Sequence, residues 1–145
     1  MTKFKYILAI DPSGNFSEGK GISGWCLMND KGELIETGVI KATTYNRPEE
    51  YWNGHKNMIH HFIEKYKDDM IVVIENFILY KDKAVSQSNS QMETCRLIGL
   101  LQWYLWKRNI PYSLQRATDV KHRWSDDLLA RERIIYKDNG YWRHT

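Results

Sequence analysis

The sequence predicts one α/β domain over residues 1–145, with a mixed sheet of three antiparallel strands followed by parallel strands, and with flanking helices. Three short apolar segments separated by glycine-containing turns come first, and two helical segments with a continuous apolar run between them follow. A chain of 145 residues is long enough to bury a core of its own, because about 70% of the unfolded surface is hidden at this size.

The antiparallel part of the sheet is predicted near the N-terminus. We expect strands over 4–10, 22–28 and 34–41, since each is a short apolar run bounded by turn-forming residues. The second and third are joined by Asn-Asp-Lys-Gly, whose Asp and Gly favour a hairpin turn. The three strands are therefore expected to form a meander.

A helix is predicted to begin at Pro48 and to run to Tyr66. Proline is tolerated at the first helical position, and apolar side chains follow at helical spacing. His55 lies on this apolar stripe and is expected to be a half-buried packing residue. The next run, MIVVI at 70–74, predicts a buried central strand that ends on Glu75.

A polar loop is predicted over 80–91, and Ser90 with Glu93 is expected to form a capping box that opens a helix ending near Arg108. This helix is apolar nearly all round from 97 to 106, so it is either deeply buried or shared with another subunit. A short strand over 111–114, a brief capped helix over 125–133 and a terminal hairpin around an Asn-Gly turn complete the chain.

Composition narrows the possible compartments and partners. No stretch approaches the roughly 20 apolar residues of a membrane helix, so no membrane partner is expected. Cys26 and Cys95 lack CxxC spacing, which favours reduced, buried thiols in a cytosolic protein. The net charge is +3, and basic residues outnumber acidic ones from Lys107 onward. That distribution suits a polyanion partner, but it also suits an ordinary solvated surface.

Two carboxylates end the most apolar strands. Asp11 follows the first strand and Glu75 follows the central one. If these strands are parallel neighbours, both side chains emerge at the same edge of the sheet, where open α/β sheets bind ligands. Carboxylate oxygens suit Mg²⁺, and a pair of such ions can activate water against a phosphodiester. Asp11 could instead be only a turn residue, because Asp-Pro-Ser-Gly is a good β-turn sequence.

Five segments, LAIDPSGN, GISGWCLM, IVVIENF, CRLIGLLQWYL and DVKHRW, occur in this order along nearly the whole chain. Together they resemble the RuvC-type Holliday junction resolvases of the ribonuclease H-like superfamily, in particular the bacteriophage versions. The resemblance implies a ribonuclease H-like sheet and a homodimer that cuts four-way DNA junctions with metal-activated water. It also implies that Asp11 and Glu75 are the catalytic acids and bind two Mg²⁺ ions, with Mn²⁺ as an alternative metal.

The resemblance further implies a set of DNA-contacting residues. They are Tyr80, Lys81, Lys83, Ser86, Gln87, Asn89, Lys121 and Arg123. Lysine, arginine and polar side chains contact phosphates, and an aromatic ring at position 80 would stack on or wedge between bases. Each of these residues could equally be an ordinary exposed loop residue. A protein of this kind is expected in the cytoplasm, which is the host cytoplasm if the gene belongs to a phage.

The sequence departs from the family at its C-terminal end. Family members close the site with acidic residues on a C-terminal helix, and this sequence shows no such helix, so we expect a truncated or incomplete chain. Asp126 and Asp127 fit the first turn of the predicted 125–133 helix as capping charges, and we do not expect them to replace the missing acids.

Two other functions are compatible with these patterns. The first is a domain of the same fold that binds branched DNA without cutting it. The second is an actin-like or sugar-kinase-type ATP-binding domain, because an Asp at a strand end before a glycine turn also occurs in the phosphate loop of those proteins. They need a second glycine-rich loop and a longer chain, and an ATP-binding assay separates them from a nuclease.

Overall fold

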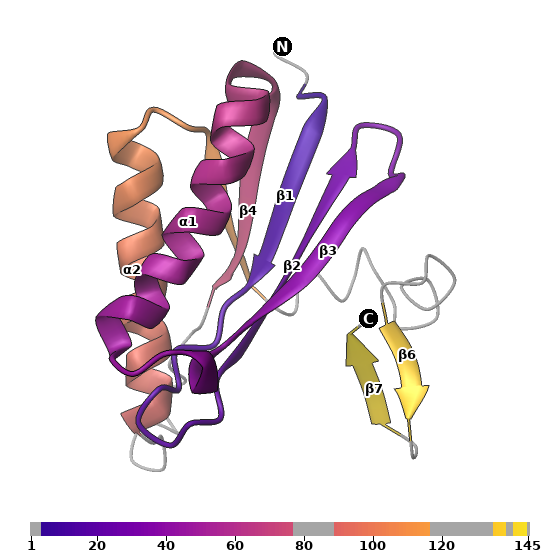
Figure 1. The fold of residues 1–145 in the computed structure, drawn as a ribbon. Coiled ribbons are helices and arrows are strands. Elements are labelled where there is room, and N and C mark those ends of the chain that lie inside the picture. Colours follow the sequence, from indigo (N-terminus) through magenta and orange to yellow (C-terminus); the bar gives the residue numbers. More distant parts are fainter. Residues whose placement is uncertain (1–3, 77–88, 117–134, 139–140, 145) are drawn as a thin grey trace.

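The computed structural model describes residues 4–76, 89–116, 135–138 and 141–144 (Figure 1). Its elements are β1 (Tyr6–Asp11), β2 (Ile22–Asn29), β3 (Leu34–Lys41), η1 (Ala42–Thr44), α1 (Pro48–Tyr66), η2 (Lys67–Asp69), β4 (Met70–Asn76), α2 (Asn89–Lys107), β5 (Tyr112–Arg116), β6 (Ile135–Asp138) and β7 (Tyr141–His144). Strands β1 to β5 form one sheet, and β6 pairs with β7 in a second, two-stranded sheet.

The five-stranded sheet has the predicted mixed topology, with the strand order β3-β2-β1-β4-β5. β1 pairs antiparallel with β2, and β2 pairs antiparallel with β3. β4 then pairs in parallel with both β1 and β5. The meander followed by parallel strands is therefore confirmed, and it places the N-terminal strand at the centre of the sheet.

Both long helices cover one face of this sheet (Figure 1). Alternate residues of the central strands point toward them, and these side chains are buried, as Leu8 of β1 and Val72 of β4 show. The helices supply the other half of the core. Their buried residues are Tyr51, His55, Ile59, Phe62 and Ile63 of α1, and Leu97, Ile98, Leu101, Tyr104 and Leu105 of α2. The intervening residues of β1 and β4 consequently face the opposite side of the sheet.

The start of α2 differs from the prediction. The helix begins at Asn89, so Ser90 lies inside it and the predicted capping box is wrong. The Glu93 carboxylate instead accepts hydrogen bonds from Phe16 and Ser17, in the turn between β1 and β2. A tertiary partner has replaced the local one, because the turn presents its own N–H groups to this side chain.

α2 is also less completely buried than its composition suggests. Leu97, Leu101 and Leu105 are fully buried, but the Trp103 and Trp106 side chains are 52% and 67% exposed. The apolar residues therefore divide between a core face and a face open to solvent within the described structure. This division leaves the alternative of a helix shared between subunits open.

The terminal hairpin and the two cysteines agree with the sequence patterns. The terminal hairpin is present, with Asp138 paired to Tyr141 across positions 139–140. Cys26 and Cys95 are free and partly buried, and burial raises the pKa of the Cys26 thiol to about 11. The predicted helix over 125–133 lies outside the described residues. No described helix combines the length and apolarity that crossing a bilayer requires.

β3 packs closely on β2 at Gly38, which lies opposite Trp25. A Cβ added at Gly38 would lie 2.6 Å from Cε2 of Trp25, whose ring packs edge-on against Phe62 at 5.3 Å between centroids. Because the indole is held by the core, Gly38→Ala should lower the free energy of unfolding by about 1–3 kcal/mol, a cost typical of overpacking. Chemical denaturation measures this change.

The matched control is Thr37→Ala, one residue earlier on the same strand and facing the other side of the sheet. Its cost should stay below about 1 kcal/mol, the span of strand propensities. Equal costs for the two variants would show that Trp25 moves aside and that the contact is not restrictive.

Candidate functional site

Asp11 and Glu75 occupy neighbouring positions on two parallel strands. Asp11 is the last residue of β1, and Glu75 is the second-last residue of β4. The register pairs Ile10 with Ile74, so the next step along both strands brings the two acids side by side. Adjacent strands are about 4.8 Å apart.

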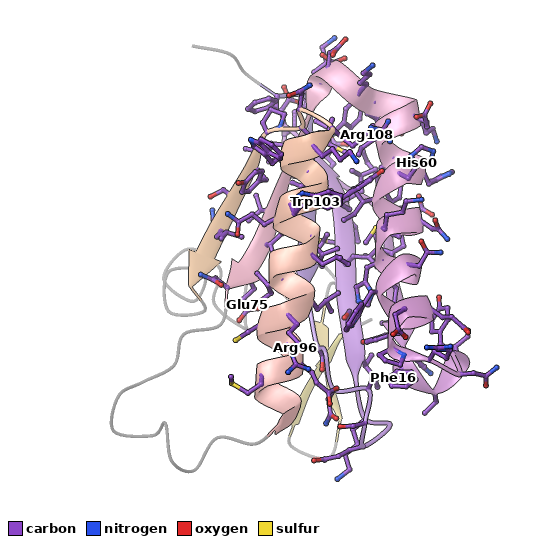
Figure 2. All side chains as sticks on the ribbon, turned by 90° about the vertical axis from the view of Figure 1, so that its left-hand side faces the viewer. Phe16, His60, Glu75, Arg96, Trp103 and Arg108 are labelled. Atoms are coloured by element: carbon purple, nitrogen blue, oxygen red, sulfur yellow. The ribbon has the colours of Figure 1, made fainter. Side chains whose placement is uncertain are left out.

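The two carboxylates share the face of the sheet opposite the helices. Ile10 and Ile74 are buried on the helix side, and successive side chains of a strand point to opposite faces. Asp11 is exposed and Glu75 is partly exposed. Figure 2 shows Glu75 toward the end of the molecule that carries Phe16 and Arg96, away from the end that carries His60 and Arg108.

The neighbouring strands extend this pair into a row across the sheet. Gly24 of β2 pairs with Asp11, and Gln115 of β5 pairs with Glu75. Glycine places no side chain beside Asp11, and glutamine offers both an amide donor and a carbonyl acceptor beside Glu75. One surface of the sheet therefore carries two adjacent acids, with glutamine as the neighbour on one side and glycine on the other.

This pair suits a hard divalent cation as a partial ligand set. Mg²⁺ is commonly held by one or two carboxylates and keeps several waters or phosphate oxygens as its other ligands. Within the described ranges, no group of three or more His, Cys, Asp or Glu side chains could hold a metal ion. The described residues thus fit an ion held by two carboxylates and shared with water and substrate oxygens.

The chain directly after Asp11 is held by a buried polar cluster. Ser13 N–H donates to Ser23 Oγ at 2.9 Å, and the Tyr51 hydroxyl donates to the Ser13 carbonyl at 2.5 Å. His55 completes the cluster, with Nδ1 2.8 Å from the Tyr51 carbonyl and Nε2 2.7 Å from Ser23 Oγ. Ser23 and His55 are completely buried.

These contacts determine the tautomer of His55. The Tyr51 carbonyl can only accept, so Nδ1 carries the proton, and Nε2 therefore accepts from the Ser23 hydroxyl. Burial lowers the pKa of His55 from its ordinary value of 6.5 to about 4, against a smaller opposing effect of the hydrogen bond to the Tyr51 carbonyl. The imidazole is neutral near pH 7.

The expectation that His55 is a half-buried packing residue is therefore wrong. It is a fully buried, doubly hydrogen-bonded residue that supports the turn after Asp11. The helical spacing correctly placed it on the buried stripe, but its partner Ser23 lies 32 residues away on β2. No local sequence pattern predicts the hydrogen bond between His55 and Ser23.

Most of the predicted DNA-contacting residues lie outside the described residues. They are Tyr80, Lys81, Lys83, Ser86, Gln87, Lys121 and Arg123. Asn89 is the first residue of α2, and its side chain is also outside the description. The structure thus brings Asp11 and Glu75 together, and the DNA-contacting set stays a prediction.

The fold is similar to that of RuvC from T. thermophilus. A structure of T. thermophilus RuvC in complex with Holliday junction substrate matches with a TM-score of 0.63 and 12% identity, over 88% of this chain and 74% of that chain. A Thermus thermophilus RuvC structure matches with a TM-score of 0.59 and 15% identity, over 81% and 67% of the respective chains. No protein-family model matches the sequence, and no match is found among curated proteins. At these identities the likeness shows the fold, a ribonuclease H-like sheet of the RuvC type.

The His55 cluster predicts a pH dependence of stability. Between pH 6.5 and 4 the unfolded chain binds a proton on this side chain that the folded protein does not, so stability rises with pH in this window. Protonation of His55 does not lower the free energy of unfolding above pH 6.5, and it lowers this free energy by about 3 kcal/mol as the pH drops to 4. Urea denaturation at several pH values measures it.

His55→Gln should be less stable near neutral pH and should lose this part of the slope between pH 6.5 and 4. The control is His61→Gln, which changes an exposed histidine of the same helix and should keep the wild-type slope. An unchanged slope in His55→Gln would mean that other groups cause the acid loss of stability.

Proposed function

We propose that this protein is a metal-dependent endonuclease that resolves four-way (Holliday) or other branched DNA junctions. The observation that carries the proposal is the adjacency of Asp11 and Glu75 at the ends of β1 and β4, on a sheet of the RuvC type. A similar structure is a RuvC bound to a Holliday junction substrate, which supports a branched-DNA partner. The finer assignment to the bacteriophage resolvases rests on the five sequence segments alone.

The residues have distinct roles in this proposal. When bound, two Mg²⁺ ions, or Mn²⁺ in their place, supply an activated water and stabilise the leaving oxygen of a phosphodiester. Asp11 and Glu75 hold the ions from one surface of the sheet, and the exposure of Asp11 lets a phosphate approach it. The buried cluster of Ser23, Tyr51 and His55 keeps the chain after Asp11 in place.

The DNA contacts belong to the proposal as well. Tyr80, Lys81, Lys83, Ser86, Gln87 and Asn89 follow Glu75 in the chain, and Lys121 and Arg123 lie in the basic C-terminal third. Cationic side chains there would neutralise phosphates and release counterions, so junction affinity should fall steeply with salt. The protein would act in the cytoplasm, in the host cell if it is encoded by a phage.

We also propose a homodimer that packs through the exposed face of α2. Met92, Arg96, Gly99, Trp103 and Trp106 recur at spacings of three and four residues, the pattern of a helix seam. Met92, Trp103 and Trp106 are 47%, 52% and 67% exposed, and a Cβ at Gly99 would meet nothing within 4 Å. A second copy fits this face because a twofold axis matches two symmetric cuts in a four-way junction.

A protein of the same fold that binds junctions without cutting them is the second candidate. It is favoured by the observation that no third His, Cys, Asp or Glu joins the two acids among the residues that the structure describes. The two candidates share the DNA-binding step and differ only in the chemical step, so an experiment must measure both.

Asp11→Asn and Glu75→Gln should each lower the cleavage of a synthetic four-way junction in Mg²⁺ by more than about 100-fold. Even residues that only support metal ligands cost 10–100-fold when changed, and ligands cost more. Junction binding, measured by gel shift, should persist. Asp69→Asn is the matched control, since it changes an exposed carboxylate of η2, directly before β4 and at the opposite end of that strand from Glu75.

A wild-type protein that binds junctions and never cuts them would establish the second candidate. If Asp11→Asn or Glu75→Gln cleaved the junction as fast as wild type, the acid changed in that variant would not be catalytic.

Trp103→Glu combined with Trp106→Glu should convert the dimer to a monomer, because two charges would be buried against their own copies. Sedimentation velocity measures the change in mass. Asn57→Glu adds a charge to an exposed position of α1 and should leave the dimer intact. A monomeric wild type, or a dimer that survives both substitutions, would contradict the α2 interface.

A further inference from the structure

The turn between β1 and β2 is hydrogen-bonded to the first turns of α2. The Glu93 carboxylate accepts from Phe16 N–H at 2.7 Å, from Ser17 N–H at 3.2 Å and from the Ser17 hydroxyl at 2.5 Å. The next residue of the helix, Thr94, accepts from Gly14 N–H at 2.9 Å. Two adjacent helix side chains thus satisfy four donors of this turn.

The two backbones are also in close contact at Gly14. A Cβ on this residue would lie 2.5 Å from the backbone nitrogen of Thr94 and would also overlap the Glu93 carbonyl. Gly14 itself is buried. Neither the turn nor the helix can shift toward the other, so the hydrogen bonds act across a packed contact.

The segment after Asp11 is therefore fixed from two sides. On one side, Ser13 is bonded to Ser23 and Tyr51. On the other, Gly14 and the two residues after Asn15 are bonded to α2. α2 is the next described element after β4, the strand that carries Glu75. The contact of Glu93 and Thr94 with the turn therefore connects the chain that follows Asp11 to the helix that follows Glu75.

Glu93 itself does not have the environment of a metal ligand. Its two oxygens already accept three hydrogen bonds from the turn. It belongs to a helix that covers one face of the sheet (Figure 1). Asp11 and Glu75 each follow a residue buried on that face, so their strand positions face the opposite side. Burial raises the pKa of Glu93, but the hydrogen bonds from Ser17 and Phe16 and the charge of Arg96 outweigh this effect and lower it. The side chain is therefore an ionised acceptor that holds the turn.

We infer that Glu93, assisted by Thr94, is a positioning residue that holds Asp11 in register with Glu75 for metal binding. The inference rests on the proposed function, because it assigns Glu93 a part in the same site. The alternative is that the contact of Glu93 with the turn only stabilises the fold. The two differ in what happens to metal affinity when the contact is removed from a protein that stays folded.

Three variants test this role. Glu93→Ala removes all three acceptor contacts. Glu93→Gln keeps an oxygen for the two N–H groups and an amide that can donate to the Ser17 hydroxyl, so it should rescue the defect. Glu64→Ala is the control, since it removes a carboxylate of α1 that lies 3.3 Å from the Arg108 side chain. Arg108 lies at the far end of the molecule from Arg96 and Phe16 (Figure 2).

The primary measurement is Mn²⁺ affinity by calorimetry, without DNA. Glu93→Ala should weaken Asp11-dependent Mn²⁺ binding by about 10–100-fold, the range for residues that orient metal ligands. Glu93→Gln should stay within about threefold of wild type, and Glu64→Ala should be unchanged. Hydrogen exchange without metal should accelerate over residues 11–17 in Glu93→Ala only. Junction cleavage should follow the order of the metal affinities.

The outcomes separate this inference from the proposed function. If wild type shows no Mn²⁺ binding that Asp11→Asn abolishes, the proposed function is wrong and the inference fails with it. If wild type binds and cuts, and Glu93→Ala loses only stability, the contact is structural and the positioning role is wrong. If Glu93→Ala does not fold, Ser17→Ala and Thr94→Val remove single bonds of the same contact, and unchanged Mn²⁺ affinity in both would overturn the inference.

Discussion

The parallel register of β1 with β4 is the constraint on which the rest of the candidate site depends. Because Ile10 pairs with Ile74, the residues that follow them are neighbours on the opposite face. A shift of either strand by one residue would turn its buried side chains to the open face and its acid toward the helices. The burial of the isoleucines against α1 and α2 therefore secures the position of the carboxylates.

The face of the sheet that Asp11 occupies and its position at the end of β1 are fixed by different contacts. The core fixes which face each acid occupies, but the end of β1 is followed by a turn that has to be held by its own contacts. Buried Ser23 and His55 hold it from the side of β2 and α1, and Glu93 holds it from the side of α2. These are hydrogen bonds between elements far apart in sequence, so the turn is ordered only when all the layers are assembled.

This difference explains what could be predicted from the sequence. The strands follow from apolar runs and their ends, which are local signals, and the adjacency of Asp11 with Glu75 follows once β1 and β4 are parallel neighbours. The roles of His55 and Glu93 do not. Helical spacing places His55 on the buried stripe but says nothing of its hydrogen bonds. Glu93 matches a local capping box, yet its partners lie 76 and 77 residues away. A short motif cannot tell whether a carboxylate serves its own helix or a distant turn.

The closeness of Asp11 and Glu75 is useful to a cation only if the two carboxylates keep a fixed relative position. A sheet that merely needed a soluble edge could place these acids apart. Here the chain behind Asp11 is held by the buried polar cluster on one side of the turn and by the first turns of α2 on the other. A cation site built from one side chain on each of two neighbouring strands would therefore depend on the rigidity of its surroundings as much as on the two carboxylates.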